Sequence, residues 1–278
     1  MRVALTVMAL AAFAANSLLC RRALGARLID PAAFTAVRLV SGALVLAALS
    51  GLFGARAGAH PGVGGSWRSA AALFVYALAF SWAYVTLDTG TGALVLFGTV
   101  QATMIGVGML GGERPRAGEW LGLATATAGL VYLVSPGLTA PRPLGAACMA
   151  LAGAAWGAYS LRGRVVADPV RETAGNFVRT VPLAAVAFAF PWGSSGASGE
   201  GVLLAAISGA VTSGLGYVIW YRALRELSAT TAAIVQLLVP VLAAVGGVLL
   251  LAERPTLRLP LAGLLILGGV ATAVLSRR

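Results

Sequence analysis

Apolar residues dominate ten stretches of the chain, each about as long as a membrane-spanning helix. The stretches are 3–20, 31–51, 69–87, 90–111, 118–135, 143–161, 174–192, 201–221, 228–251 and 258–275. A helix needs about 20 mostly apolar residues to cross the hydrocarbon core of a bilayer. The pattern therefore predicts an all-α membrane protein with ten transmembrane helices.

Charged and turn-forming residues mark the breaks between these stretches. Asp30-Pro31 and Asp168-Pro169 are two such breaks, because proline favours the start of a helix and disfavours its interior. The shortest break is Asp88-Thr89-Gly90. The apolar region around it is too long for one span, so we predict a tight hairpin there.

The second half of the chain repeats motifs of the first half at a nearly constant spacing. Glu113-Arg114-Pro115 returns 140 residues later as Glu253-Arg254-Pro255, and Arg38 returns 141 residues later as Arg179. Met8-Ala9-Leu10-Ala11 also returns as Met149-Ala150-Leu151-Ala152. A motif that recurs in mid-chain is not a signal peptide, so we predict that the first helix is retained.

These spacings divide the chain into two five-helix repeats, residues 1–137 and residues 142–278. An odd number of helices makes the second repeat enter the membrane from the opposite side. Inverted repeats of this kind enclose substrate sites near the middle of the membrane in many secondary transporters. We therefore predict two inverted repeats around a central cavity.

The composition supports a membrane protein and explains the charge. Hydrophobic residues make up 59% of the chain and charged residues 10%, whereas soluble domains carry about 25% charged residues. The net charge is +11, but its 20 basic residues are all arginines scattered between apolar stretches. No contiguous basic face is available for phosphates, so no nucleic-acid partner is expected.

The arginines also indicate an orientation. If the N-terminus is cytoplasmic, twelve of the 20 arginines fall in cytoplasmic segments and six in external loops. Positive residues favour the cytoplasmic side. We therefore predict a protein of the bacterial cytoplasmic (inner) membrane with both termini in the cytoplasm. We expect the lipid bilayer and a small-molecule substrate as its partners. A monomer is compatible with the pattern, but the sequence does not define the oligomeric state.

Particular motifs resemble those of the drug/metabolite transporter superfamily, in its EamA-domain branch. They are the two Glu-Arg-Pro turns, the glycine-rich stretches 121–130 and 263–269, and the segment Ala154–Tyr159. The resemblance implies an exporter of amino acids, other metabolites or toxic compounds, and it is closest to exporters of aromatic amino acids. The chain departs from the pattern at Val100, where the counterpart of Pro240 would lie, and at Asn16 in the first helix.

Two arginines inside predicted spans are the first candidates for substrate binding. Arg38 and Arg179 each lie about seven residues into a helix, or roughly 10 Å at 1.5 Å per residue. A charge at membrane depth is costly and marks a functional candidate. It attracts a substrate carboxylate in one interpretation. In the other it reaches an interface or pairs with backbone carbonyls.

Amides and aromatic rings at membrane depth complete the predicted cavity. The full set of candidates is Asn16, Arg38, Tyr76, Phe80, Gln101, Trp156, Tyr159, Arg179, Tyr217 and Gln236. The amides either bind a substrate or join neighbouring helices. The rings either line a cavity for amphipathic substrates or anchor helix ends in the bilayer interface. Pro240 is expected to kink its helix, because it removes a backbone hydrogen bond.

The acidic residues limit the predicted mechanism. All nine map to loops or helix ends, and the single histidine, His60, maps to a loop. Proton-driven pumps place such groups in the transport path, so we predict a facilitative transporter that works by alternating access. Because no acidic residue or histidine maps to the interior of a predicted span, the sequence offers no catalytic residues for an enzyme. No metal site or cofactor is predicted either. Efflux of drugs or toxic metabolites is the alternative function, and a channel is a further one.

Overall fold

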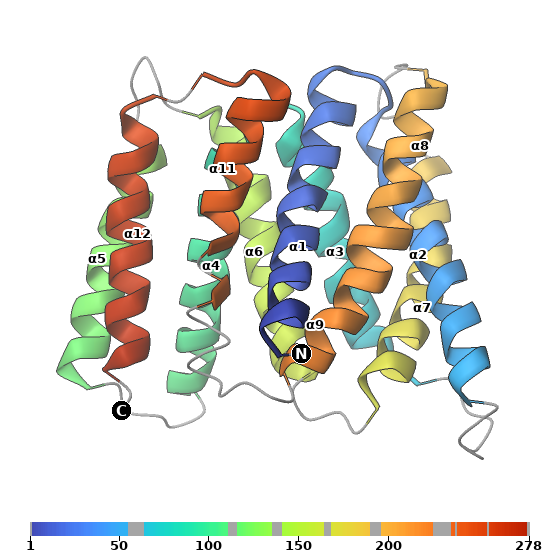
Figure 1. Ribbon diagram of the computed structural model, residues 1–278, viewed down its shortest axis with the longest axis horizontal. Coiled ribbons are helices and arrows are strands. Elements are labelled where there is room, and N and C mark those ends of the chain that lie inside the picture. The colour runs from blue at the N-terminus through green and yellow to red at the C-terminus, as the bar shows by residue number, and fades with distance from the viewer. Residues whose placement is uncertain are drawn as a thin grey trace.

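The computed structural model describes residues 2–54, 64–110, 116–134, 141–163, 168–189, 196–224, 235–236, 238–254 and 256–276. All regular elements within these ranges are helical. They are α1 (Arg2–Gly25), α2 (Pro31–Gly54), α3 (Trp67–Tyr84), α4 (Thr89–Leu110), α5 (Ala117–Val134), α6 (Pro143–Gly163), α7 (Pro169–Ala189), α8 (Gly199–Ile207), η1 (Ser208–Leu215), α9 (Gly216–Leu224), α11 (Leu238–Leu251) and α12 (Arg258–Leu275). They run side by side along one direction (Figure 1).

The ten-helix prediction is confirmed within the described residues. Elements α8, η1 and α9 follow one another without a break and form one continuous segment, so that ten helical segments result. Judged by length and composition alone, five of them are long and apolar enough to span a bilayer, and α11 and α12 are shorter apolar helices. Most of the first part of the predicted span 228–251, up to residue 237, lies outside the described residues.

Helix α1 continues further than the sequence predicts. The apolar stretch was expected to end at residue 20, before Arg21 and Arg22, but the helix ends at Gly25. Both arginines are paired with carboxylates, so their charges do not interrupt the helix. Ala9 and Cys20 of this helix are fully buried. Helix α1 is therefore an integral part of the core.

The helices of the two halves pack mainly against each other. Helices α5 and α12 form a pair at one edge of the bundle (Figure 1), α2 packs along α7, and α3 packs along α6. A Cβ on Gly122 or Gly269 would collide with the backbone of the opposite helix. These two glycines therefore allow the close approach of α5 and α12.

The outer surface of the bundle is apolar, as a bilayer requires. Large side chains that point outward include Leu110, Leu144, Leu203, Leu249 and Leu264. Exposed apolar surface on this scale is unfavourable in water. The first and last helices begin and end at the same end of the bundle (Figure 1), which we call the terminal end. The opposite end, where α1 meets the α3–α4 and α11–α12 connections, is called the distal end.

One segment departs from α-helical geometry. Ser208–Leu215 forms a π-helix, η1, in the middle of the span that contains α8 and α9. The side chain of Thr212 donates a hydrogen bond to the Ser208 carbonyl (2.9 Å), and a Cβ on Gly209 would collide with the backbone carbonyl of Arg38 in α2. Such π-helical turns are frequent at functional sites. The close contact places α2 directly against η1.

Candidate functional site

Aromatic rings from four helices meet in the middle of the bundle. Trp156 of α6 lies 4.9 Å from Tyr76 of α3 and 4.9 Å from Tyr217 of α9, measured between ring centroids. Phe13 of α1 contacts both Trp156 (6.4 Å) and Tyr217 (6.1 Å). Phe80 continues the cluster at 5.3 Å from Tyr76. These tilted and edge-on arrangements are the favourable geometries for aromatic pairs.

A cavity of about 20 Å³ lies within this cluster. Its walls are formed by Phe13, Asn16, Ser17, Tyr76, Phe80, Leu96, Phe97, Trp156, Thr212 and Tyr217. The volume suffices for about one water molecule. Drug-sized ligand pockets measure about 300–1,000 Å³, so side chains and helices must move apart before a substrate fits here.

Arg38 lies directly behind the Tyr76 and Phe80 rings. Its side chain is among the largest that are fully buried, with 1% of its surface exposed. The guanidinium carbon lies 5.3 Å from the Tyr76 ring centroid and 5.2 Å from that of Phe80. Its Nε donates to Ser213 Oγ at 3.1 Å, and its Nη2 donates to Tyr76 Oη at 3.3 Å. The charge is thus held by hydroxyl groups and ring faces.

Two polar atoms beside the cavity lack hydrogen-bond partners. Arg38 Nη1 and Tyr217 Oη are both buried and make no hydrogen bond. Tyr217 and Tyr76, which accepts a hydrogen bond from Arg38, both pack on the Trp156 ring. A buried donor without a partner costs about 1–3 kcal/mol, and more if it is charged. Each of the two groups can therefore donate a hydrogen bond to an acceptor from outside the chain.

Asn16 of α1 also lines the cavity. Its side-chain oxygen accepts hydrogen bonds from Ser208 Oγ (2.7 Å) and Thr212 Oγ1 (3.1 Å), and its side chain is buried. The amide thereby joins α1 to η1. It joins neighbouring helices, as one of the two interpretations predicts, and it also lines the cavity; substrate binding by this amide stays a prediction.

Other predicted residues lie elsewhere or in a second layer. Tyr159 is buried and stacks on Trp156 at 5.6 Å without lining the cavity. Arg179 donates to the backbone carbonyls of Gly64 and Gly175. This is the pairing with backbone carbonyls that one of the two interpretations predicts. Its helix places it against the chain preceding α3, outside the aromatic cluster.

The two glutamines and Pro240 are not among the residues that line this cavity. Gln101 is buried beside a separate small cavity between α4, α5 and α12. Gln236 is half-buried in a short described stretch. Pro240 lies in α11 (Leu238–Leu251), and residues 235–236 before it are helical as well, so the kink expected at Pro240 stays a prediction.

Sequence reasoning missed the cavity residues Phe13 and Thr212 and the Arg38 partner Ser213. Phenylalanine and small hydroxyl residues are common in membrane helices, so nothing in their type distinguishes them. Ser213 is placed by the π-helical register of η1, which an apolar pattern does not reveal. The recurrence of serine and threonine within Ser208–Leu215 was the available signal.

The described acidic residues occupy helix starts and connections, as predicted. Asp30 accepts hydrogen bonds from the backbone N–H groups of Ala32 (3.0 Å) and Ala33 (2.9 Å) at the start of α2. Glu119, Glu172 and Glu200 lie in the first turns of their helices, where the helix dipole favours negative charge. No cluster of possible metal ligands occurs among the described residues.

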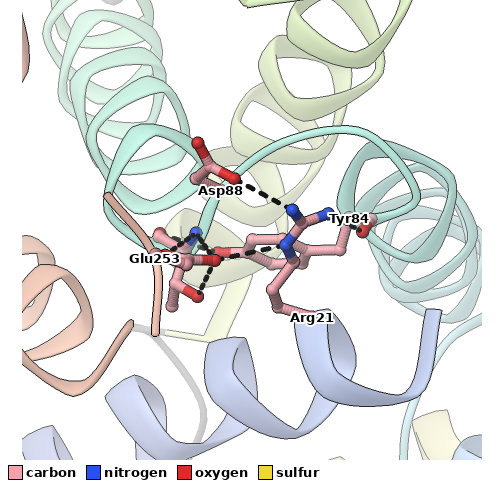
Figure 2. A network of polar contacts seen from close by, with 5 residues as sticks. Arg21, Tyr84, Asp88 and Glu253 are labelled. Carbon is pink, nitrogen blue, oxygen red and sulfur yellow. Dashed lines mark hydrogen bonds and ion pairs between the residues drawn. The ribbon is translucent and has the colours of Figure 1, made fainter. Parts of the chain in front are cut away.

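A second polar arrangement, the distal network, closes the distal end of the bundle (Figure 2). Arg21 at the end of α1 donates to Glu253 Oε1 (3.2 Å) and to Asp88 Oδ1 (2.9 Å). Glu253 also accepts from the backbone N–H and the hydroxyl of Thr89, each at 2.9 Å. The Tyr84 carbonyl accepts from Arg21 at 3.4 Å. The network ties α1 to the α3–α4 and α11–α12 connections.

A ten-helix membrane bundle with a polar and aromatic cavity between its halves defines a membrane transporter of small molecules. The sequence profile of the EamA-like transporter family matches residues 143–275. The chain belongs to this family, and thereby to the drug/metabolite transporter superfamily.

Two similar proteins match nearly the whole length of the chain. An uncharacterised protein of Pseudomonas aeruginosa is 52% identical over 273 residues, which cover 98% of this chain and 94% of that protein. A protein of known crystal structure is 23% identical, with a TM-score of 0.69 and 99% of both chains covered. At that identity the likeness concerns the fold alone.

Proposed function

We propose that this protein exports amino acids, aromatic or broadly neutral ones, across the bacterial inner membrane. The observation that carries the proposal is the central cavity, in which Tyr76, Trp156 and Tyr217 surround a space bordered by the Asn16 amide. Aromatic faces accept an apolar or aromatic side chain, and they also attract an ammonium group. The cavity thus combines the features that an amphipathic amino acid requires.

The transport cycle proposed here is alternating access between two inverted repeats, residues 1–137 and 142–278. Helix pairings across the halves support these boundaries, since α5 packs on α12 and α2 packs on α7. The distal network holds one end of the bundle together while the cavity is small. In this cycle the distal network opens after substrate has entered from the terminal end.

We further propose that transport is facilitative. The seven described acidic residues lie at helix starts and in connections, and Asp88 and Glu253 are already paired with Arg21. A proton-coupled carrier needs a titratable group in the transport path. The excess of arginine in the segments at the terminal end supports cytoplasmic termini.

Efflux of other apolar or toxic compounds is the second candidate function. The cavity walls are mostly aromatic and aliphatic, and such walls accept many apolar molecules. The guanidinium of Arg38 behind Tyr76 and Phe80 disfavours lipophilic cations by like charge. Neutral or zwitterionic compounds are therefore favoured over cationic drugs.

The test is counterflow in proteoliposomes with a panel of labelled amino acids and a lipophilic cation, with and without a pH gradient. We expect trans-stimulated exchange of neutral amino acids that the gradient does not change. Trp156→Ala should reduce exchange, whereas Trp67→Ala, which changes an exposed ring at the start of α3, should not. Exchange of the cation alone would contradict amino-acid export, and flux without trans-stimulation would indicate a channel.

A further inference from the structure

We propose that Arg38 and Tyr217 together bind the carboxylate of the transported molecule, so that this protein selects small monocarboxylates. The inference rests on the proposed transport function and specifies the chemical group that the site recognises. Its basis is a buried cation that no carboxylate of the described protein neutralises, next to a buried hydroxyl that has no partner.

The donors of Arg38 are only partly used within the protein. Nε donates to Ser213 Oγ and Nη2 to Tyr76 Oη, whereas Nη1 has no partner although it is buried. A guanidinium remains protonated at every physiological pH. Hydroxyl groups and ring faces stabilise its charge less than an anion does, because they carry only partial charges.

Tyr217 supplies a second free donor at the same place. Its ring lines the cavity and stacks against Trp156, and its hydroxyl is buried without a hydrogen bond. The Tyr76 and Tyr217 rings both pack on Trp156 at 4.9 Å, and Arg38 donates to the Tyr76 hydroxyl at 3.3 Å. Tyr217 therefore belongs to the same cluster of side chains as the guanidinium.

The surroundings of Arg38 provide no counter-ion from the described parts of the chain. The groups that contact its guanidinium are Ser213, Tyr76 and Phe80, and none of them is a carboxylate. Asp30, eight residues before Arg38, uses its carboxylate to cap the start of α2. Removing a cation from water without an anion costs several kcal/mol, so an anionic group of the substrate gains this energy on binding.

The number of free donors selects the anion. Arg38 Nη1 and Tyr217 Oη offer one hydrogen bond each, which matches the two oxygens of a carboxylate. A phosphate monoester carries about two negative charges, and the single guanidinium of Arg38 balances only one of them. A lipophilic cation is repelled. The site therefore favours monocarboxylates.

The experiment measures exchange and ligand-induced thermal stabilisation of the purified protein with four phenylalanine-like probes. They are phenylalanine, its primary amide, the corresponding α-keto acid, and a phosphate monoester of similar size. We expect the two carboxylates to be exchanged with a KM at least about tenfold lower than the amide, as a hydrogen bond to a charged group implies. The phosphate ester should not compete.

Three variants separate binding from folding. Arg38→Gln should abolish the preference for acid over amide, and Arg38→Lys should restore part of it. Tyr217→Phe should weaken it severalfold without lowering the melting temperature, because the hydroxyl makes no hydrogen bond inside the protein. Arg179→Gln and Tyr132→Phe remove a cation and a hydroxyl elsewhere, and they should leave the preference intact.

Each outcome assigns a failure to one proposal. Equal exchange of phenylalanine and its amide, or a preference that survives Arg38→Gln, overturns the carboxylate inference while amino-acid transport stands. Exchange of the keto acid without any amino acid overturns amino-acid export while the carboxylate inference stands. Absence of both exchange and stabilisation with all carboxylates overturns both.

Discussion

Arg21 and Arg38 are two inward-pointing arginines with opposite surroundings. Arg21 is partly exposed and contacts two carboxylates, Glu253 and Asp88, at 3.2 Å and 2.9 Å. Arg38 is fully buried and contacts hydroxyl groups and aromatic rings, with no carboxylate among the described residues. A cation that already has its anions serves the structure. A buried cation that has no anionic partner within the described protein can bind an anion from outside the chain.

The comparison predicts the largest loss of stability at the distal network. Glu253→Ala should lower the free energy of unfolding by about 3–4 kcal/mol, because it leaves Arg21 with a partly exposed carboxylate only and removes the partner of the buried Thr89 N–H. Reversible unfolding in detergent mixtures measures this. A change below about 1 kcal/mol would show that the network contributes little to the closed end.

Arg38 should respond in the opposite way. Arg38→Met should reduce exchange of a carboxylate substrate at least thirtyfold, or about 2 kcal/mol, yet leave the melting temperature unchanged or higher. An uncompensated buried charge is replaced by an apolar side chain of similar length, which is neutral or stabilising in other proteins. Both quantities are measured on one preparation. Loss of stability comparable to that of Glu253→Ala would remove the distinction between the two arginines.

An intermediate effect is expected where α2 touches η1. Gly209→Ala should destabilise the protein by about 1–3 kcal/mol, because the added methyl group collides with the Arg38 carbonyl and the Ser41 hydroxyl. The same change displaces Ser213 from Arg38 and should raise the KM for carboxylates. Gly51→Ala, at an open position of the same helix α2, is the control and should have neither effect.

The smallest effects are expected at exposed ion pairs of the distal end. Glu200→Gln breaks the pair with Arg22, in which about half of each side chain is exposed, and should cost less than about 1 kcal/mol. Asp88→Asn should behave similarly, since its side chain is 54% exposed. Both effects should disappear in high salt, where such pairs are screened. A persistent loss would mean that these pairs act together with the buried part of the network.

The ten segments followed from the sequence because each is an apolar run bounded by charged or turn residues. The boundaries were less accurate where charges are paired, as at Arg21 and Arg22, whose partners lie more than 60 residues away. Helix α7 likewise begins at Pro169 rather than 174, because Asp168 caps it by accepting a hydrogen bond from the Arg171 N–H at 3.2 Å and proline suits the first helical position.

The site was partly predictable for a physical reason. Arg38, Asn16 and the aromatic residues are conspicuous in apolar stretches, since polar and ionisable groups are costly there. Their partners were not predictable, because each comes from a distant segment. Arg38 and Arg179 look equivalent in the repeat, yet one meets Ser213 in η1 and the other the carbonyl of Gly64.

The π-helix gives the site a dependence on chain length. Its backbone bonds connect residues five apart rather than four, so the segment Ser208–Leu215 accommodates more residues per turn than an α-helix. Deleting one residue there would restore α-helical bonding and rotate every later side chain by about 100° around the helix axis. Tyr217 and Trp220 would then point away from Phe13 and Trp156. A single-residue insertion or deletion in this segment can therefore change which side chains line the cavity, although the lining residues themselves are not substituted.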